Sequence, residues 1–156
     1  MSVARPQPPG GPSTRTLRSA AASQVCLPVF QRSVAAHRPQ LKAMRADLAG
    51  WLLLHGTDQV LTDRIVLACS EAVANAVEHG CGYDPDCDIT MVASIEAGTL
   101  RLRVENPGPW DDSESQAYRG HGVELMRRLM DDVQITTGSA TTTVVLRHRV
   151  FAAPGG

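Results

Sequence analysis

The feature that most constrains this chain is the segment S-E-A-V-A-N-A-V-E-H-G, residues 70–80. On a helix, Glu71, Asn75 and His79 would lie in one row, because their spacing of four residues is close to one turn. The residues around them are mostly alanine and valine, so the row should be partly buried. Buried polar groups need partners. One interpretation is that a bound ligand supplies these partners. The alternative is that the row is an ordinary polar stripe solvated by water.

The chemistry of this row suits a metal ion and a reacting hydroxyl group. The amide oxygen of Asn75 is a ligand type that Mg²⁺ accepts. The carboxylate of Glu71 can take a proton from an attacking hydroxyl or water. We therefore expect a site built on this helix, with Glu71 and Asn75 at its centre.

The remaining hydrophobic pattern predicts an α+β domain. In chain order it indicates a strand in 24–30, a helix over 39–54, a helix from a cap at Thr57 or Asp58 to about His79, a hairpin of 88–95 and 100–104, a loop over 106–119, a helix over 123–130 and a hairpin of 133–137 and 141–150. Tight hairpins favour a two-layer sandwich, with a mixed, mostly antiparallel sheet covered on one face by helices.

Composition divides the chain and excludes several classes of function. Residues 1–21 are rich in Pro, Gly, Ser and Arg, so we expect a disordered tail before a domain over 22–150 and a short tail over 151–156. An organelle transit peptide is the alternative for the first tail. The net charge of -1 and the short apolar runs predict a cytoplasmic protein that binds neither nucleic acid nor membrane.

The four cysteines lack any C-x-x-C pair, so we expect reduced thiols. Cys81 and Cys87 with His79 are an alternative metal-ligand set, although their spacing matches no standard zinc pattern.

Three further segments have features of a ligand site. In V-E-N-P-G-P-W, residues 104–110, Asn106 stands at a strand tip, where an amide can read a base edge, and Gly108 allows close approach. The alternative is a simple turn.

The second of these segments is R-G-H-G, which contains Arg119, Gly120, His121 and Gly122. Two glycines immediately before a helix would leave backbone N–H groups free to bind phosphate. In the third, Thr141 and Thr143 enter the last strand and can donate to a phosphate, although threonine is also simply a good strand residue.

In this order the four segments resemble the motifs of the gyrase, heat-shock-chaperone, histidine-kinase and mismatch-repair ATPase superfamily, the Bergerat or histidine-kinase-like ATPase fold. The first segment is similar to its N-box, complete at Glu71, Asn75, Ala76 and His79. The others are similar to the G1 box, the G2 box and the final glycine-threonine strand. Over residues 22–149, the chain looks most like the anti-sigma-factor serine kinases of bacteria.

The resemblance implies ATP and Mg²⁺ as ligands, with Glu71 as general base and Asn75 as the Mg²⁺ ligand. Gly108, Gly120 and Gly122 would shape the pocket and its lid. It further implies that the protein sequesters a sigma factor and phosphorylates a serine of an anti-anti-sigma partner, and it suggests a homodimer.

The chain departs from the family in the G1 box, which normally reads D-x-G-x-G. Asn106 replaces the aspartate and Trp110 replaces the last glycine. An amide oxygen still accepts from the adenine amino group, at a cost of order 1 kcal/mol. A regulator that binds nucleotide without kinase activity is therefore the main alternative. The catalytic half of a sensor kinase and a ligand-free domain are less favoured.

Overall fold

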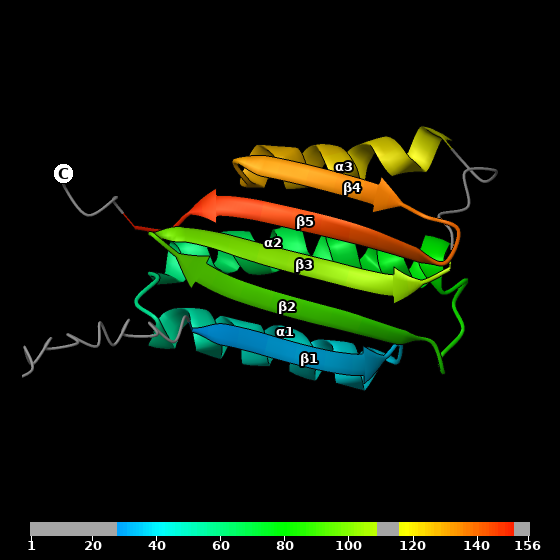
Figure 1. The fold of residues 1–156 in the computed structure, drawn as a ribbon, viewed down its shortest axis with the longest axis horizontal. Helices are drawn as coiled ribbons and strands as arrows, with labels where there is room; N and C mark the ends of the chain where they lie inside the picture. Colours follow the sequence, from blue (N-terminus) through cyan, green and yellow to red (C-terminus); the bar gives the residue numbers. More distant parts are fainter. Residues whose placement is uncertain (1–27, 109–115, 152–156) are drawn as a thin grey trace, which may run out of the picture.

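The computed structural model describes residues 28–108 and 116–151. Figure 1 shows the elements along the chain. They are β1 (Val29–Ala35), α1 (Arg38–Leu54), α2 (Gln59–Asn75), a π-helical turn η1 (Ala76–Gly80), β2 (Asp88–Glu96), β3 (Thr99–Pro107), α3 (Gln116–Leu129), β4 (Asp132–Thr137) and β5 (Thr141–Arg149).

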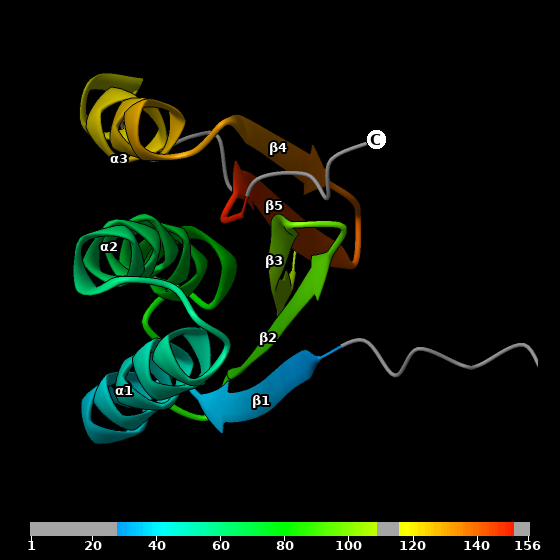
Figure 2. The same cartoon turned by 90° about the vertical axis from the view of Figure 1, so that its left-hand side faces the viewer.

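The five strands form one sheet in the order β1-β2-β3-β5-β4. Each neighbouring pair is antiparallel. All three helices lie on one face of this sheet, as Figure 2 shows. The predicted two-layer α+β fold is confirmed, and its described strands pair in the antiparallel sense throughout.

The core lies between the sheet and the helices because strand residues alternate in direction. Leu100, Leu102 and Val104 of β3 are buried, whereas Arg101 between them is exposed. Burying each such aliphatic side chain stabilises the fold by about 1.5–3 kcal/mol.

The start of α2 follows capping chemistry. Asp58 is the cap of α2, since its carboxylate accepts a hydrogen bond from the backbone N–H of Leu61 at 2.7 Å. Thr57, the other candidate, is buried and shares a hydrogen bond with the hydroxyl of Thr62 at 2.8 Å. The sequence patterns therefore place α1 and α2 correctly.

Two predictions about irregular regions are wrong. The predicted strand over 24–30 overlaps β1 only at its end, because the strand pairs with β2 over Val29–Ala35; residues 24–27 lie outside the described residues. The predicted loop over 106–119 is shorter, because β3 stays paired with β5 through Pro107 and α3 begins at Gln116.

Most of the predicted tails lies outside the described residues. Phe151, assigned to the second tail, packs against the core, and its backbone N–H donates to Gly98 at 3.1 Å. Among the described residues, no helix has the length and apolar character needed to cross a membrane.

Candidate functional site

Glu71 and Asn75 of α2 lie opposite Gly122 of α3. A methyl group added at Gly122 would lie 3.0 Å from Oε2 of Glu71 and 3.6 Å from Oδ1 of Asn75. Both side chains are partly buried. We call Glu71, Asn75 and Gly122 the helix cluster. It brings a carboxylate oxygen and an amide oxygen to one point, as the spacing of four predicted.

His79 continues this row only in part. It lies in η1, where the helix widens and Cys81 donates its N–H to the carbonyl of Ala76 at 2.8 Å. The wider turn changes the direction in which His79 leaves the helix axis. Its side chain is 9% exposed, and Nε2 lies 3.9 Å from Oε2 of Glu78.

Asn106, the residue before the last of β3, lies against Gly80 of η1. The side chain of Asn106 is buried, and a methyl group added at Gly80 would lie 1.7 Å from its Nδ2 atom. Only glycine fits at position 80 in this arrangement. Nδ2 donates to the carbonyl of Pro107 at 3.0 Å, which leaves Oδ1 as an acceptor for another group.

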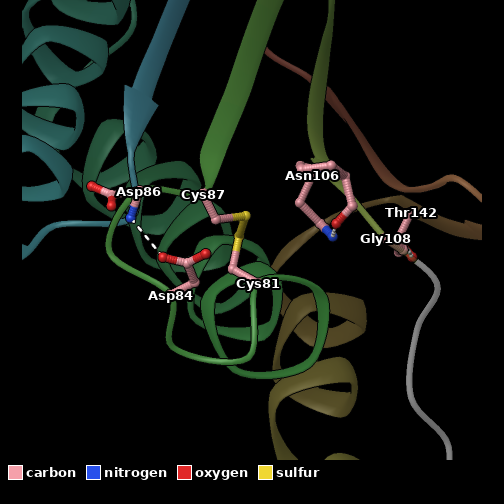
Figure 3. Close-up of a disulfide and its surroundings, with 8 residues drawn as sticks. Cys81, Asp84, Asp86, Cys87, Asn106, Gly108 and Thr142 are labelled. Atoms are coloured by element: carbon pink, nitrogen blue, oxygen red, sulfur yellow. Dashed lines mark hydrogen bonds between the residues drawn. A yellow bond between two sulfur atoms is a disulfide. The ribbon is translucent and has the colours of Figure 1, made fainter.

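Gly108 completes this end of the site. Its φ of +96° favours glycine, and a methyl group there would lie 2.9 Å from the carbonyl oxygen of Gly80. Its N–H donates to Ala140 at 2.8 Å, and its carbonyl accepts from the hydroxyl of Thr142 at 3.2 Å. We call Gly80, Asn106, Gly108 and Thr142 the strand-tip cluster; Figure 3 shows three of its members, Asn106, Gly108 and Thr142.

The segment R-G-H-G does not stand before a helix. Arg119, Gly120, His121 and Gly122 all lie within α3. The expectation of free N–H groups at a helix start is therefore wrong for these glycines. Glycine costs a helix only about 1 kcal/mol relative to alanine, which packing of α3 on α2 can offset. His121 is exposed.

The last strand separates its threonines between two faces. Thr143 donates to Oε2 of Glu105 at 3.3 Å, on the sheet face away from the helices, and Thr141 is exposed beside the strand tip. The structure brings neither to the helix cluster. Thr142, which the motif reading missed, is buried on the helix face. Its alternation with Val144 was the signal that could have identified it.

The expectation of reduced thiols is wrong for Cys81 and Cys87. Cys81 and Cys87 form a disulfide, because two turns bring their Cα atoms to 5.6 Å. They are therefore not zinc ligands with His79. In the described part of the chain, no three His, Cys, Asp or Glu side chains group to hold a metal. Burial raises the pKa of the Cys69 thiol to about 12.

Comparisons with known proteins identify similar chains. The chain is 27% identical over 120 residues to the serine-protein kinase RsbW of Listeria monocytogenes, covering 67% of this chain and 76% of the relative. It is 28% identical over 93 residues to the anti-sigma F factor of Anoxybacillus flavithermus, covering 51% and 64%.

A solved structure has the same fold. The crystal structure of the RsbU and RsbW domains of Rv1364c from Mycobacterium tuberculosis superposes with a TM-score of 0.63 at 29% identity, covering 81% of this chain. The chain spans 34% of that larger protein. The family model described as histidine kinase-like ATPase domain matches residues 34–148. This match covers most of the chain, which therefore belongs to the histidine kinase-like ATPase domain family.

Proposed function

We propose that this protein is an ATP-dependent serine kinase and anti-sigma factor. It would phosphorylate a serine of an anti-anti-sigma partner and sequester a sigma factor. The observation that carries the proposal is the convergence of Glu71 and Asn75 beside Gly122. The names of the relatives, a serine-protein kinase and an anti-sigma F factor, support it.

Asn75 is the residue that would hold Mg²⁺. Mg²⁺ usually takes one or two protein oxygen ligands and keeps several waters, so an amide beside a carboxylate fits it without a larger cluster. When bound, the ion neutralises charge on the phosphates. Asn75 is partly buried, and a methyl group at Gly122 would lie 3.6 Å from its Oδ1 and 3.7 Å from its Nδ2, so the amide stands at the point that Glu71 also reaches.

Glu71 acts as the general base in this proposal. Its carboxylate would accept the proton of the partner's serine hydroxyl while that oxygen attacks the γ-phosphorus of ATP and ADP leaves. The residues of α3 that would surround the phosphates are Arg119, Gly120, His121 and Gly122.

The strand-tip cluster would receive the adenine base. Oδ1 of Asn106 would accept from its amino group, since Nδ2 is already turned to Pro107. Thr141 and Thr142 lie at this end of β5, and Thr142 replaces Thr143 in the proposal because it lies on the helix face. His79 would support the pocket from η1.

The proposal places the protein in the bacterial cytoplasm as a homodimeric regulator of transcription. The second candidate is a partner-switching module that binds nucleotide without kinase activity. The neutral amide of Asn106, in place of the family's aspartate, favours it.

Calorimetric titration with ATP tests the proposal, with and without Mg²⁺. Clear binding that weakens when EDTA removes Mg²⁺, and again in Asn75→Ala, is expected. Gln59→Ala is the control, because Gln59 is an exposed amide at the other end of α2. Absence of binding at millimolar ATP would contradict both candidates. Transfer of labelled phosphate to a co-expressed anti-anti-sigma protein then distinguishes the serine kinase from the module that binds nucleotide without kinase activity.

A further inference from the structure

The Cys81–Cys87 disulfide begins at the residue next to Gly80 of the strand-tip cluster. Cys81 follows Gly80 directly, and Cys87 precedes the first residue of β2. Figure 3 shows the bond between Cys81 and Cys87 in one view with Asn106. We propose that Cys81 and Cys87 are a reversible thiol–disulfide exchange site that sets the nucleotide affinity of the pocket. This inference rests on the proposed function.

The bond joins η1 to the sheet. At one end, the N–H of Cys81 closes the wide turn on Ala76 at 2.8 Å. At the other end, the carbonyl of Cys87 accepts from the N–H of Ala36 at 2.8 Å, next to the paired strands β1 and β2. The bond is therefore a covalent connection between the helix end that carries Gly80 and the sheet that carries Asn106.

The loop that the bond closes is also held by backbone hydrogen bonds: the N–H of Tyr83 donates to the carbonyl of Val77 at 2.9 Å, that of Asp84 to Cys81 at 3.0 Å, and that of Cys87 to Asp84 at 3.2 Å. Residues 82–86 are all exposed, and both Gly82 and Tyr83 have positive φ values, of 57° and 62°. Positive φ is unfavourable for a tyrosine, so the loop depends on its surroundings to hold this shape. Breaking the disulfide would return conformational freedom to residues 82–86 and to Gly80, the residue before Cys81.

The strand-tip cluster has no free space around Gly80, where this added freedom would act. The Cα of Gly80 packs against the Asn106 side chain so closely that even a methyl group would overlap it. A methyl group added at Gly108 would also lie only 2.9 Å from the carbonyl oxygen of Gly80. A displacement of Gly80 therefore displaces the group proposed to receive the base.

The solvent exposure of Cys81 and Cys87 favours thiol–disulfide exchange at this pair. Cys81 and Cys87 are both partly exposed, whereas Cys69 is fully buried. In the reducing cytoplasm, disulfides are usually transient and sense redox state. The sites of exchange among the described cysteines are thus confined to the loop beside the nucleotide pocket.

The exchange partner is a dithiol reductant of the thioredoxin class. Its thiolate attacks one sulfur of the disulfide, which releases the other cysteine as a thiol and forms a mixed disulfide. Its second thiol then displaces the remaining cysteine. Two electrons and two protons pass to Cys81 and Cys87, and the reductant becomes a disulfide. Glutathione disulfide supports the reverse reaction.

The test compares the full chain after reduction with dithiothreitol and after oxidation with glutathione disulfide. Maleimide labelling and mass spectrometry assign the state of Cys81 and Cys87 in each sample. Calorimetry then gives the Kd for Mg²⁺-ATP. We expect the reduced protein to bind roughly fivefold to tenfold more weakly, at the lower end of the couplings seen between linked sites.

Two variants separate this effect from others. Cys81→Ser with Cys87→Ser should bind like the reduced protein and lose the redox response, whereas Cys26→Ser should keep it. Equal, measurable affinities in both redox states would overturn the inference and leave the proposed function intact. Failure to form the bond under oxidation would also overturn it. Lack of ATP binding in either state would contradict the proposed function as well.

Discussion

The two ends of the candidate site are built differently. The strand-tip cluster joins a helix end to two strand ends through backbone contacts and a buried amide, with no room for an added methyl group at Gly80. The helix cluster instead consists of two partly exposed side chains on α2 that meet one residue of α3.

Under the proposed function, this difference would separate nucleotide binding from catalysis. The strand-tip cluster is shaped by the sheet and by glycines, so small changes there should alter nucleotide affinity. The helix cluster depends on functional groups that solvent partly reaches and on how α3, held by the buried Met126 and Met130, lies on α2. Changes there should alter catalysis more than base recognition.

The largest expected effect is at the helix cluster. Glu71→Ala should lower the rate of serine phosphorylation by about 10²-fold or more, the scale of a lost general base. ATP affinity should be retained, because the base-binding end is untouched. Initial rates of phosphate transfer and calorimetric titration measure the two effects. Asp63→Ala, an exposed acid on the same helix, is the control. Phosphorylation at the parental rate would remove Glu71 from the mechanism.

The next effect is at the strand tip. Gly80→Ala forces a methyl group onto the buried Asn106 side chain, and such overpacking costs about 1–3 kcal/mol. We expect a lower melting temperature and ATP binding about tenfold weaker, since 1.4 kcal/mol corresponds to tenfold. Gly50→Ala is the matched control, because nothing lies within 4 Å of an added methyl group on α1. If both variants bind ATP equally well, the strand-tip cluster is not the base site.

The smallest expected effect is at Asn106, in the same strand-tip cluster. Asn106→Asp should tighten ATP binding by roughly fivefold, because a charged acceptor replaces a neutral one at a gain of order 1 kcal/mol. Preference for ATP over GTP should also rise. The variant loses the hydrogen bond from Nδ2 to Pro107, so its melting temperature should fall slightly. Competition titrations and thermal unfolding measure the two changes separately. Weaker ATP binding by Asn106→Asp would show that the amide of Asn106 binds the adenine base better than a carboxylate does.

Much of the fold could be predicted from the sequence because periodicity reflects burial directly. The alternation around Leu100 and Leu102 identified β3, and the spacing in 39–54 identified α1. The regions that failed lack such a signal. Gln116–Arg119 is too short to show a helical period of its own, so the sequence pattern did not indicate that α3 begins at Gln116.

The candidate site divides in the same way. The sequence by itself determined the chemical groups of the helix cluster, since Glu71 and Asn75 are neighbours on one regular helix. Only the tertiary structure decided that Gly80 must be glycine and that Cys81 bonds to Cys87. These features depend on contacts between segments distant in the chain or on the path of an irregular loop, and neither leaves a periodic pattern in the sequence.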